Sequence, residues 1–584
     1  MKRISYTTKE LSFGNAEFYR DGNRLTVHVP YNGAYGMGEK YDSLNQKGKT
    51  VINAVQEKFC FQGDKTYCTT PFFWTDTGFG LYVDTCEVTT FDFGDKCIEI
   101  KLPETADVVL FSGTPEEMVR EYMSLFGPAV LPPEWTMGIW ISANRWNAQK
   151  DVDELLAKLK KYDFPASIVV LEAWSDEATF YIWNGAKYEP VPDGQALKYE
   201  DFDFSDTPWP DPAKMVQDIH DAGLKLLLWQ VPVYKKQGDD EVQDAQNDLD
   251  REDAAARKLC VTVPDGTPYT IPKGNWFPDS MVPDFTNPET VKSWFGKRQY
   301  LLDIGVDGFK TDGGEFIHRN DAQFHNGTTG KEGVNRYSRD YTESYRNFVG
   351  SNGVIFSRAG FSGQHTVPCH WGGDQQSQNS ELASVLKAGL SAAASGMIFW
   401  GFDLAGFAGP LPTLDLYRRA TQMACFCPIM QWHSEPDGGQ FRELMPGAEG
   451  NNERSPWNME ESYAAYGFMD EMRYWHKLHE LLRPYLWKTA QECVRDNKPF
   501  MRPLIYEWPN DINAVNCQDE YLLGDDLLVA PLLEENATSR EVYLPDGVWF
   551  DFFDGTEYSG NQTVTAGKNG KLPVFTRNGF ELKK

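Results

Sequence analysis

Eight short apolar runs alternate with helical patterns between residues 131 and 480, and this alternation strongly limits the possible folds. The runs are short enough for buried strands, whereas amphipathic stretches such as DVDELLAKLKKY separate them. Strands that alternate with helices form a parallel sheet, and eight such units close into a (β/α)₈ barrel. The runs are WTMGIWIS (135–142), ASIVVLEAW (166–174), LKLLLWQVP (224–232), VDGFKTDGG (306–314), GVIFSRAG (353–360), VPCHWGGD (367–374), MIFWGFDLAG (397–406) and CPIMQWHSE (427–435).

The segments on either side of this pattern indicate antiparallel β-structure. Residues 1–130 contain alternating runs such as RLTVHVP and CIEIKL, followed by a helix for which Thr114 is the candidate N-cap. Residues 481–584 return to short strands such as SREVYLP and VWFDFFDG. We therefore predict an α/β protein with a (β/α)₈ TIM barrel over 131–480, flanked by an N-terminal β-sandwich (1–130) and a C-terminal β-sandwich (481–584).

Two connections inside the barrel region are too long for ordinary loops between a strand and the next helix. They cover about 175–210 and 233–280 and are rich in Asp, Gly, Pro and aromatic residues. Because active sites of such barrels lie at the carboxyl ends of the strands, we expect these insertions to form a subdomain or lid over that rim.

Charge and composition exclude several classes of protein. The net charge of −29 disfavours nucleic-acid binding, which needs clustered Lys and Arg. No stretch reaches the ~18 apolar residues of a membrane span, and the N-terminal segment lacks the apolar core of a signal peptide. We expect a cytoplasmic bacterial protein with reduced cysteines; a secreted protein whose leader was removed is the alternative.

Common cofactor and metal motifs are absent. The chain has no GxGxxG that opens a helix after a strand, no Walker loop and no HExxH, and its nine histidines are not paired at ligand spacing. The sequence therefore implies neither a metal nor a cofactor, and it leaves the oligomeric state open, a homo-oligomer included.

The ends of the predicted strands carry carboxylates instead. Each alone is more often structural than catalytic, but burying several together is costly unless they are paired or used. A rim that gathers carboxylates and aromatic residues suggests a glycosidase that works with two carboxyl groups. The acidic residues are Glu172, Asp312, Glu315, Asp374 and Asp403, and the same strand ends carry Lys310, Arg358, His433, Trp229 and Trp371.

Several motifs, taken in order, resemble glycoside hydrolase family 31. They are YGMGEKYDSLN (35–45), GVDGFKTDGGE, FSRAG, HWGGDQ, FWGFDLAGF, PIMQWHSE and YLLGDDLLVAPLL (521–533). Each is moderately specific alone, whereas seven in the family's order over about 500 residues are strongly specific. That family contains retaining α-glycosidases and related transglycosylases, and a distal second C-terminal β domain found in many members is expected to be missing.

The resemblance implies two catalytic aspartates. Asp312 would be the nucleophile, with Lys310 and Arg358 favouring its charged form. Asp374 would be the general acid and then the general base, and a second carboxylate nearby would raise its pKa. Glycines 313, 314, 372 and 373 would let the backbone approach the sugar closely.

The other family contacts to the terminal sugar map onto five residues. Arg358, Asp403 and His433 would bond sugar hydroxyls, Trp371 would form an apolar wall and Trp229 would help to form the pocket floor. One departure concerns the second strand, which ends in Glu172 where most members have Asp. The longer side chain puts the sugar or its linkage in doubt, although Glu172 reaching the same hydroxyl from a shifted backbone is an equal alternative.

We therefore predict a retaining exo-α-glycosidase that releases terminal α-linked glucose from small oligosaccharides by a two-aspartate double displacement. The alternatives are an α-xylosidase, an α-galactosidase and an α-glucosyl transglycosylase. An inactive carbohydrate-binding protein is the alternative outside enzymes, and the presence of both candidate aspartates argues against it.

Overall fold

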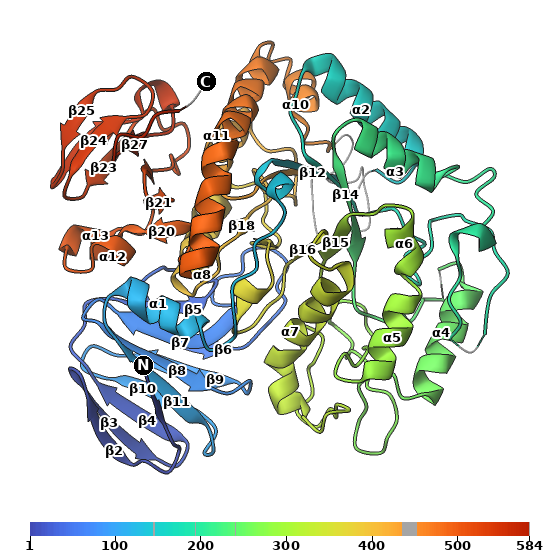
Figure 1. The fold of residues 1–584 in the computed structure, drawn as a ribbon, viewed down its shortest axis with the longest axis horizontal. Coiled ribbons are helices and arrows are strands. Elements are labelled where there is room, and N and C mark those ends of the chain that lie inside the picture. The colour runs from blue at the N-terminus through green and yellow to red at the C-terminus, as the bar shows by residue number, and fades with distance from the viewer. Residues whose placement is uncertain (144–145, 193, 240, 435–451, 583–584) are drawn as a thin grey trace.

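The computed structural model describes residues 1–143, 146–192, 194–239, 241–434 and 452–582. Its centre is an eight-stranded parallel sheet in the order β18-β17-β16-β15-β14-β13-β12-β19. A parallel bridge between Asp403 and Gln431 joins the two ends of this order, with Leu404 N donating to Gln431 O at 3.0 Å, so the sheet closes. The predicted (β/α)₈ barrel is confirmed (Figure 1).

Each predicted run overlaps one barrel strand. The strand residues are buried on both faces, as in a sheet that is covered by helices outside and filled inside. Glu435, the last residue of the eighth run, lies outside the described residues. The strands are β12 (Ile139–Ala143), β13 (Ile168–Leu171), β14 (Lys225–Gln230), β15 (Gly308–Thr311), β16 (Val354–Ser357), β17 (His370–Trp371), β18 (Trp400–Gly401) and β19 (Met430–Ser434).

The helices around the barrel follow the predicted apolar spacing. In α2, for example, Val152, Leu155 and Leu159 recur at intervals of three and four and are buried. The helices are α2 (Gln149–Tyr162), α3 (Pro212–Asp221), α4 (Ala245–Ala256), α5 (Pro288–Gly296), α6 (Gln299–Asp303), α7 (Gly330–Val349), α8 (Asn379–Ala394), α9 (Leu414–Cys425), α10 (Pro456–Tyr463) and α11 (Phe468–Asp496). Position 480, where we expected the barrel domain to end, lies inside α11.

The N-terminal part consists of two antiparallel sheets with an apolar core between them that includes Phe73, Leu81 and Phe91. One sheet has the order β1 (Lys2–Ile4), β11 (Asp107–Ser112), β8 (Phe79–Asp84), β7 (Thr69–Thr75), β5 (Ala34–Gly38). The other has the order β2 (Glu10–Phe13), β3 (Ala16–Asp21), β4 (Arg24–His28), β10 (Ile98–Lys101), β9 (Thr89–Phe93), β6 (Thr50–Asn53). Thr114 caps α1 (Pro115–Met123) in a capping box with Glu117, as its position predicts.

The C-terminal part is also built of antiparallel strands, and in Figure 1 it lies on the same side of the barrel as the N-terminal sheets. Its larger sheet has the order β20 (Met501–Pro503), β21 (Tyr521–Leu523), β22 (Leu527–Val529), β27 (Val574–Thr576), β24 (Val548–Asp551), β25 (Glu557–Ser559). A second sheet pairs β23 (Arg540–Leu544) with β26 (Gln562–Ala566), and two short helices are α12 (Leu504–Glu507) and α13 (Ile512–Asn516).

The two long insertions pack against each other. Tyr188 Oη donates to Asp244 Oδ2 at 2.8 Å, and Tyr181 Oη donates to Asp250 Oδ2 at 2.9 Å. Val191 N donates to the side chain of Gln246 at 2.8 Å. Residues of the first insertion therefore bind the start and middle of α4, which belongs to the second, and the two form one unit beside the rim.

Two further properties follow from the described residues. The ten cysteines form no disulfide with one another. Among the helices that the structure describes, none is long and apolar enough to cross a membrane.

Candidate active site

A cavity of about 690 Å³ opens at the carboxyl ends of the barrel strands, within the ~300–1,000 Å³ typical of small-molecule sites. Three of the predicted site residues follow directly on a strand: Glu172 after β13, Asp312 after β15 and Arg358 after β16. Because these strands are parallel neighbours, their ends meet at one rim. The predicted residues that line the cavity are Glu172, Trp229, Lys310, Asp312, Arg358, Asp374, Asp403 and His433.

Arg358 lies between three carboxylates. Its Nε is 3.2 Å from Asp312 Oδ1, and its Nη1 is 3.1 Å from Asp374 Oδ2. Glu315 accepts hydrogen bonds from Nε at 3.2 Å and from Nη2 at 3.1 Å. The guanidinium is 2% exposed, so one buried cation holds both candidate catalytic aspartates close together.

Asp312 is fixed on several sides. Trp229 Nε1 donates to its Oδ2 at 2.9 Å, and the amide of Gly313 donates to its Oδ1 at 2.7 Å. With the Arg358 contact on Oδ1, every one of these partners is a donor or a cation. These partners hold both carboxyl oxygens of Asp312 in place, as a nucleophile with a fixed direction of attack requires.

Asp374 is in a different environment. Burial raises the pKa of Asp374 to about 8, Arg358 opposes this shift, and the nearby negative charges of Asp312 and Glu57 add to it. The two aspartates thus share one cation but differ in their other partners. A carboxyl group that keeps its proton near neutral pH can act as a general acid.

Glu172 belongs to a second charged cluster in the cavity. Its Oε1 accepts a hydrogen bond from Lys310 Nζ, lies 2.7 Å from His433 Nε2 and accepts a hydrogen bond from Ser142 Oγ at 3.3 Å. Burial alone would raise the pKa of Glu172, but the charges of His433 and Lys310 outweigh burial and lower it. Glu172 is therefore an ionised carboxylate that three neighbouring side chains hold in place.

Asp403 and Trp371 differ in where they lie. Asp403 lines the cavity and accepts a hydrogen bond from Gln431 Nε2. Trp371 does not line the cavity: it is 1% exposed and packs below Lys310, whose Nζ is 4.6 Å from the ring centroid. The expected apolar wall is therefore not formed by Trp371, which supports the lysine from behind instead.

Three glycines of the two aspartate motifs pack closely against protein side chains. Gly373 has a φ of +67°, and a Cβ there would lie 2.2 Å from the ring of Tyr67. A Cβ on Gly372 would lie 2.8 Å from Val385, and one on Gly313 would lie 2.8 Å from Phe316. Neighbouring side chains already occupy the space beside these three glycines, so packing alone requires glycine there, and the expected close approach of the sugar stays a prediction.

The cavity also contains residues that sequence reasoning missed. Glu57 and Phe59 reach it from the loop between β6 and β7 of the N-terminal part, whereas Trp276 and Phe277 come from the second insertion. Trp276 and Phe277 lie in the segment GNWFPD, whose Gly, Asn, Pro and Asp are typical of a loop. Aromatic rings in a loop near the rim indicate a surface that can bind a ligand, so this pattern could have identified the pair. No comparable sequence pattern identifies Glu57, because the residues around it do not indicate that their loop reaches the barrel.

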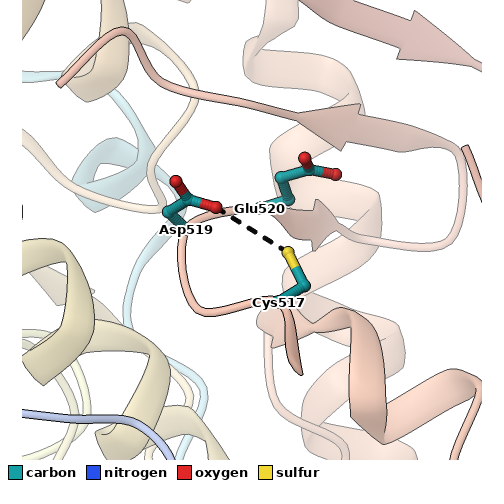
Figure 2. Close-up of side chains that lie close together, drawn as sticks. All are labelled: Cys517, Asp519 and Glu520. Atoms are coloured by element: carbon teal, nitrogen blue, oxygen red, sulfur yellow. Dashed lines mark hydrogen bonds between the residues drawn. The ribbon is translucent and has the colours of Figure 1, made fainter. Parts of the chain in front are cut away.

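Cys517, Asp519 and Glu520 form a cluster of metal-type ligands in the C-terminal part, well apart from the cavity in sequence (Figure 2). Arg540 Nη2 lies 3.0 Å from Asp519 Oδ1 and 3.4 Å from Glu520 Oε1. The thiol of Cys517 donates to Asp519 Oδ1 at 3.8 Å. Because Arg540 already supplies the positive charge, we interpret this cluster as an internal ion-pair network.

Three family models match the chain. Residues 129–489 match the "Glycosyl hydrolases family 31 TIM-barrel domain", residues 497–580 match the "Glycosyl hydrolase family 31 C-terminal domain", and residues 19–92 match the "Glycosyl hydrolase 31 N-terminal galactose mutarotase-like domain". The barrel model covers more than half of the chain.

Two curated relatives and one solved structure extend this similarity. An isomaltosyltransferase from Sporosarcina globispora is 35% identical over 94% of this chain and 51% of its own length. A 1,3-alpha-isomaltosidase from Kribbella flavida is 35% identical over 96% of this chain and 76% of its own length. A cycloalternan-degrading enzyme from Trueperella pyogenes, solved with a covalent intermediate, superposes with a TM-score of 0.90 at 34% identity over 97% of this chain and 80% of that one. The chain thus spans about half the length of the isomaltosyltransferase.

Proposed function

The chain belongs to glycosyl hydrolase family 31, and on this premise we propose that it is a retaining α-glycosidase or transglycosylase that acts on an α-linked isomaltosyl unit. The observation that carries the proposal is the placement of Asp312 and Asp374 on one buried guanidinium at the wall of one cavity. Two carboxyl groups close together beside a sugar site are the arrangement that retaining glycosidases use.

In the first step, Asp312 attacks the anomeric carbon while the bond to the leaving oxygen breaks and Asp374 gives that oxygen its proton. A glycosyl ester on Asp312 results. In the second step, Asp374 takes a proton from water or from a sugar hydroxyl, whose oxygen attacks the same carbon and releases Asp312. The raised pKa of Asp374 and the donor-rich surroundings of Asp312 support this division of roles.

The remaining charged groups would bind the donor sugar. The ionised Glu172, held by Lys310 and His433, and the carboxylate of Asp403 line the cavity and can accept hydrogen bonds from hydroxyl groups. Trp276 and Phe277 give the cavity aromatic surface that can cover the apolar face of a sugar ring.

The donor unit distinguishes two versions of the proposal. The sequence alone favoured a single terminal glucose, whereas two relatives at 35% identity are named for isomaltosyl transfer and isomaltose release. The cycloalternan-degrading neighbour has also been solved in complex with isomaltose. We therefore place the disaccharide first and the single glucose second.

The test compares p-nitrophenyl α-isomaltoside with p-nitrophenyl α-glucoside, with the isosteric Asp312→Asn variant as the inactive control. We expect kcat/KM to be at least about tenfold higher for the isomaltoside, a preference worth about 1.4 kcal/mol. Chromatography of the products with and without an added α-glucan acceptor separates hydrolysis from transfer. A preference for the glucoside would favour the single-glucose version, and undiminished activity of Asp312→Asn would refute the mechanism.

A further inference from the structure

A second hollow, which we call the side groove, adjoins the cavity at the barrel rim. It has a volume of about 530 Å³ and lies between the start of α2 and the first insertion. Asn147 lines both the cavity and the side groove, so the two spaces border the same residue. A chain that leaves the cavity past Asn147 would enter the groove.

The groove is lined by polar side chains with free hydrogen-bonding capacity. Asn147, Lys150 and Asn184 are exposed, and their side chains make no hydrogen bond to another residue that the structure describes. The lining contains one lysine and one aspartate, Lys150 and Asp153, so it carries no excess of positive charge. Uncharged, hydroxyl-rich ligands fit such a surface, whereas a phosphate would need an excess of positive charge.

Hydrogen bonds and aromatic packing hold the walls of the groove in place. Gln149 N donates to Pro208 O at 2.9 Å, and Asp211 N donates to Gln149 Oε1 at 2.9 Å, so two hydrogen bonds join α2 to the first insertion. Trp183 and Trp209, both fully buried with ring centroids 5.1 Å apart, lie next in sequence to groove residues on that side. A preformed groove binds its ligand without a large ordering cost.

We propose that the side groove binds further glucosyl residues of an oligosaccharide whose reacting end occupies the cavity. This inference rests on the proposed function for the identity of the sugar, and it adds a preference for long chains. Amide and ammonium groups would donate to sugar hydroxyls, and Asp153 would accept from them.

The test uses isomaltotriose and isomaltohexaose as probes with the Lys150→Ala/Asn184→Ala variant. Both side chains are exposed and bond no residue in the described part of the chain, so their removal should leave the fold intact. We expect the ratio of kcat/KM for the hexaose to that for the triose to fall about tenfold, as the loss of two hydrogen bonds would cause. Lys292→Ala, at an exposed lysine on α5, is the matched control and should leave the ratio as in the wild type.

Calorimetric binding of both probes to the Asp312→Asn background separates this inference from the proposed function. Tighter binding of the hexaose that disappears in the groove variant would support the groove even if neither probe were cleaved. Equal binding of the two probes, or equal loss on both in the groove variant, would overturn it even if the isomaltosyl donor were cleaved as proposed.

Discussion

Arg358 determines the charge balance of the candidate site at the scale of single residues. Three carboxylates share its guanidinium, and Glu315 takes two of the hydrogen bonds. A buried cation surrounded in this way is held in one orientation, which fixes the positions of Asp312 and Asp374 relative to each other. The negative charge of Glu315 therefore weakens the stabilisation that Arg358 gives to ionised Asp374.

Removing the candidate nucleophile gives the first prediction. Asp312→Ala should lose nearly all activity, including that on activated aryl glycosides, because no glycosyl ester can form. Added azide should restore part of the turnover and give a β-glycosyl azide, since a small anion can enter the vacated side. More than a few per cent of activity without azide would show that another group is the nucleophile.

Glu315→Gln tests whether Glu315 tunes Asp374 through Arg358. The amide keeps the shape but not the charge, so Arg358 would stabilise ionised Asp374 more strongly and lower its pKa. Activity needs protonated Asp374, so the alkaline limb of the kcat/KM profile should move to lower pH, by about half a unit to one unit.

The control for this experiment is Asp250→Asn. Asp250 is also a buried carboxylate with a cationic partner, Lys297 at 2.5 Å, but it lies in the insertion unit. Its loss should cost stability and leave the alkaline limb in place. A Glu315→Gln variant with reduced kcat and an unmoved limb would mean that Glu315 is structural only.

At the scale of elements, β15 must lie close to β16 so that Asp312 and Arg358 meet. A Cβ on Gly308, in β15, would lie 1.9 Å from Val354 O in β16. Gly308→Ala should therefore push the two strands apart, lower the free energy of unfolding by about 1–3 kcal/mol and reduce kcat by more than tenfold.

Gly296→Ala is the matched substitution for this comparison. Gly296 ends α5, and a Cβ there would meet no atom within 4 Å. Thermal unfolding and kcat of that variant should stay close to those of the wild type, within about 1 kcal/mol in stability. Equal behaviour of the two alanine variants would contradict the close approach of β15 and β16.

The secondary-structure elements could be predicted from the sequence more reliably than the contacts that their side chains make. Strand and helix periodicity gave all eight barrel strands and placed Glu172, Asp312 and Arg358 at one rim, because carboxyl ends of parallel strands must converge. Trp371 follows the same rule but faces Lys310 instead of the cavity. The orientation of an aromatic ring at a strand end depends on the side chains of the neighbouring strands. The spacing of residues along the sequence does not show which side chains these are.

At the scale of the whole molecule, the N-terminal part contributes residues to the cavity and forms hydrogen bonds with the barrel. Glu39 in its YGMGE segment accepts hydrogen bonds from Trp400 Nε1 at 3.0 Å and from Tyr41 Oη at 3.1 Å. Trp74 Nε1 donates to Ala394 O in α8 at 2.8 Å. The contacts with Trp400 and Ala394 join residues more than 300 positions apart, and such distant contacts explain why local sequence patterns do not show that Glu57 and Phe59 reach the cavity.

Glu39 also makes the interface sensitive to pH. Burial raises the pKa of Glu39 to about 8, with the two hydrogen bonds opposing. Its contribution to stability is therefore fully present below the ordinary Glu pKa and is lost as the pH rises through about 8. Glu39→Gln needs no proton, so it should raise the thermal midpoint by about 1–2 °C more at pH 8.5 than at pH 5.

Glu104→Gln, at an exposed position of the N-terminal part, is the control and should change both midpoints equally. The same difference between the two pH values for both variants would show that burial of Glu39 does not control the interface.

The proposed double displacement retains the anomeric configuration, and proton NMR of the first-formed product tests this most directly. An α-isomaltoside is hydrolysed in deuterated buffer, and the anomeric signals are recorded before mutarotation. The Asp312–Asp374 pair predicts that the α-anomer appears first and the β-anomer grows in only as mutarotation proceeds. Initial appearance of the β-anomer would contradict the account, because water would then have attacked directly and Asp312 would not be a nucleophile.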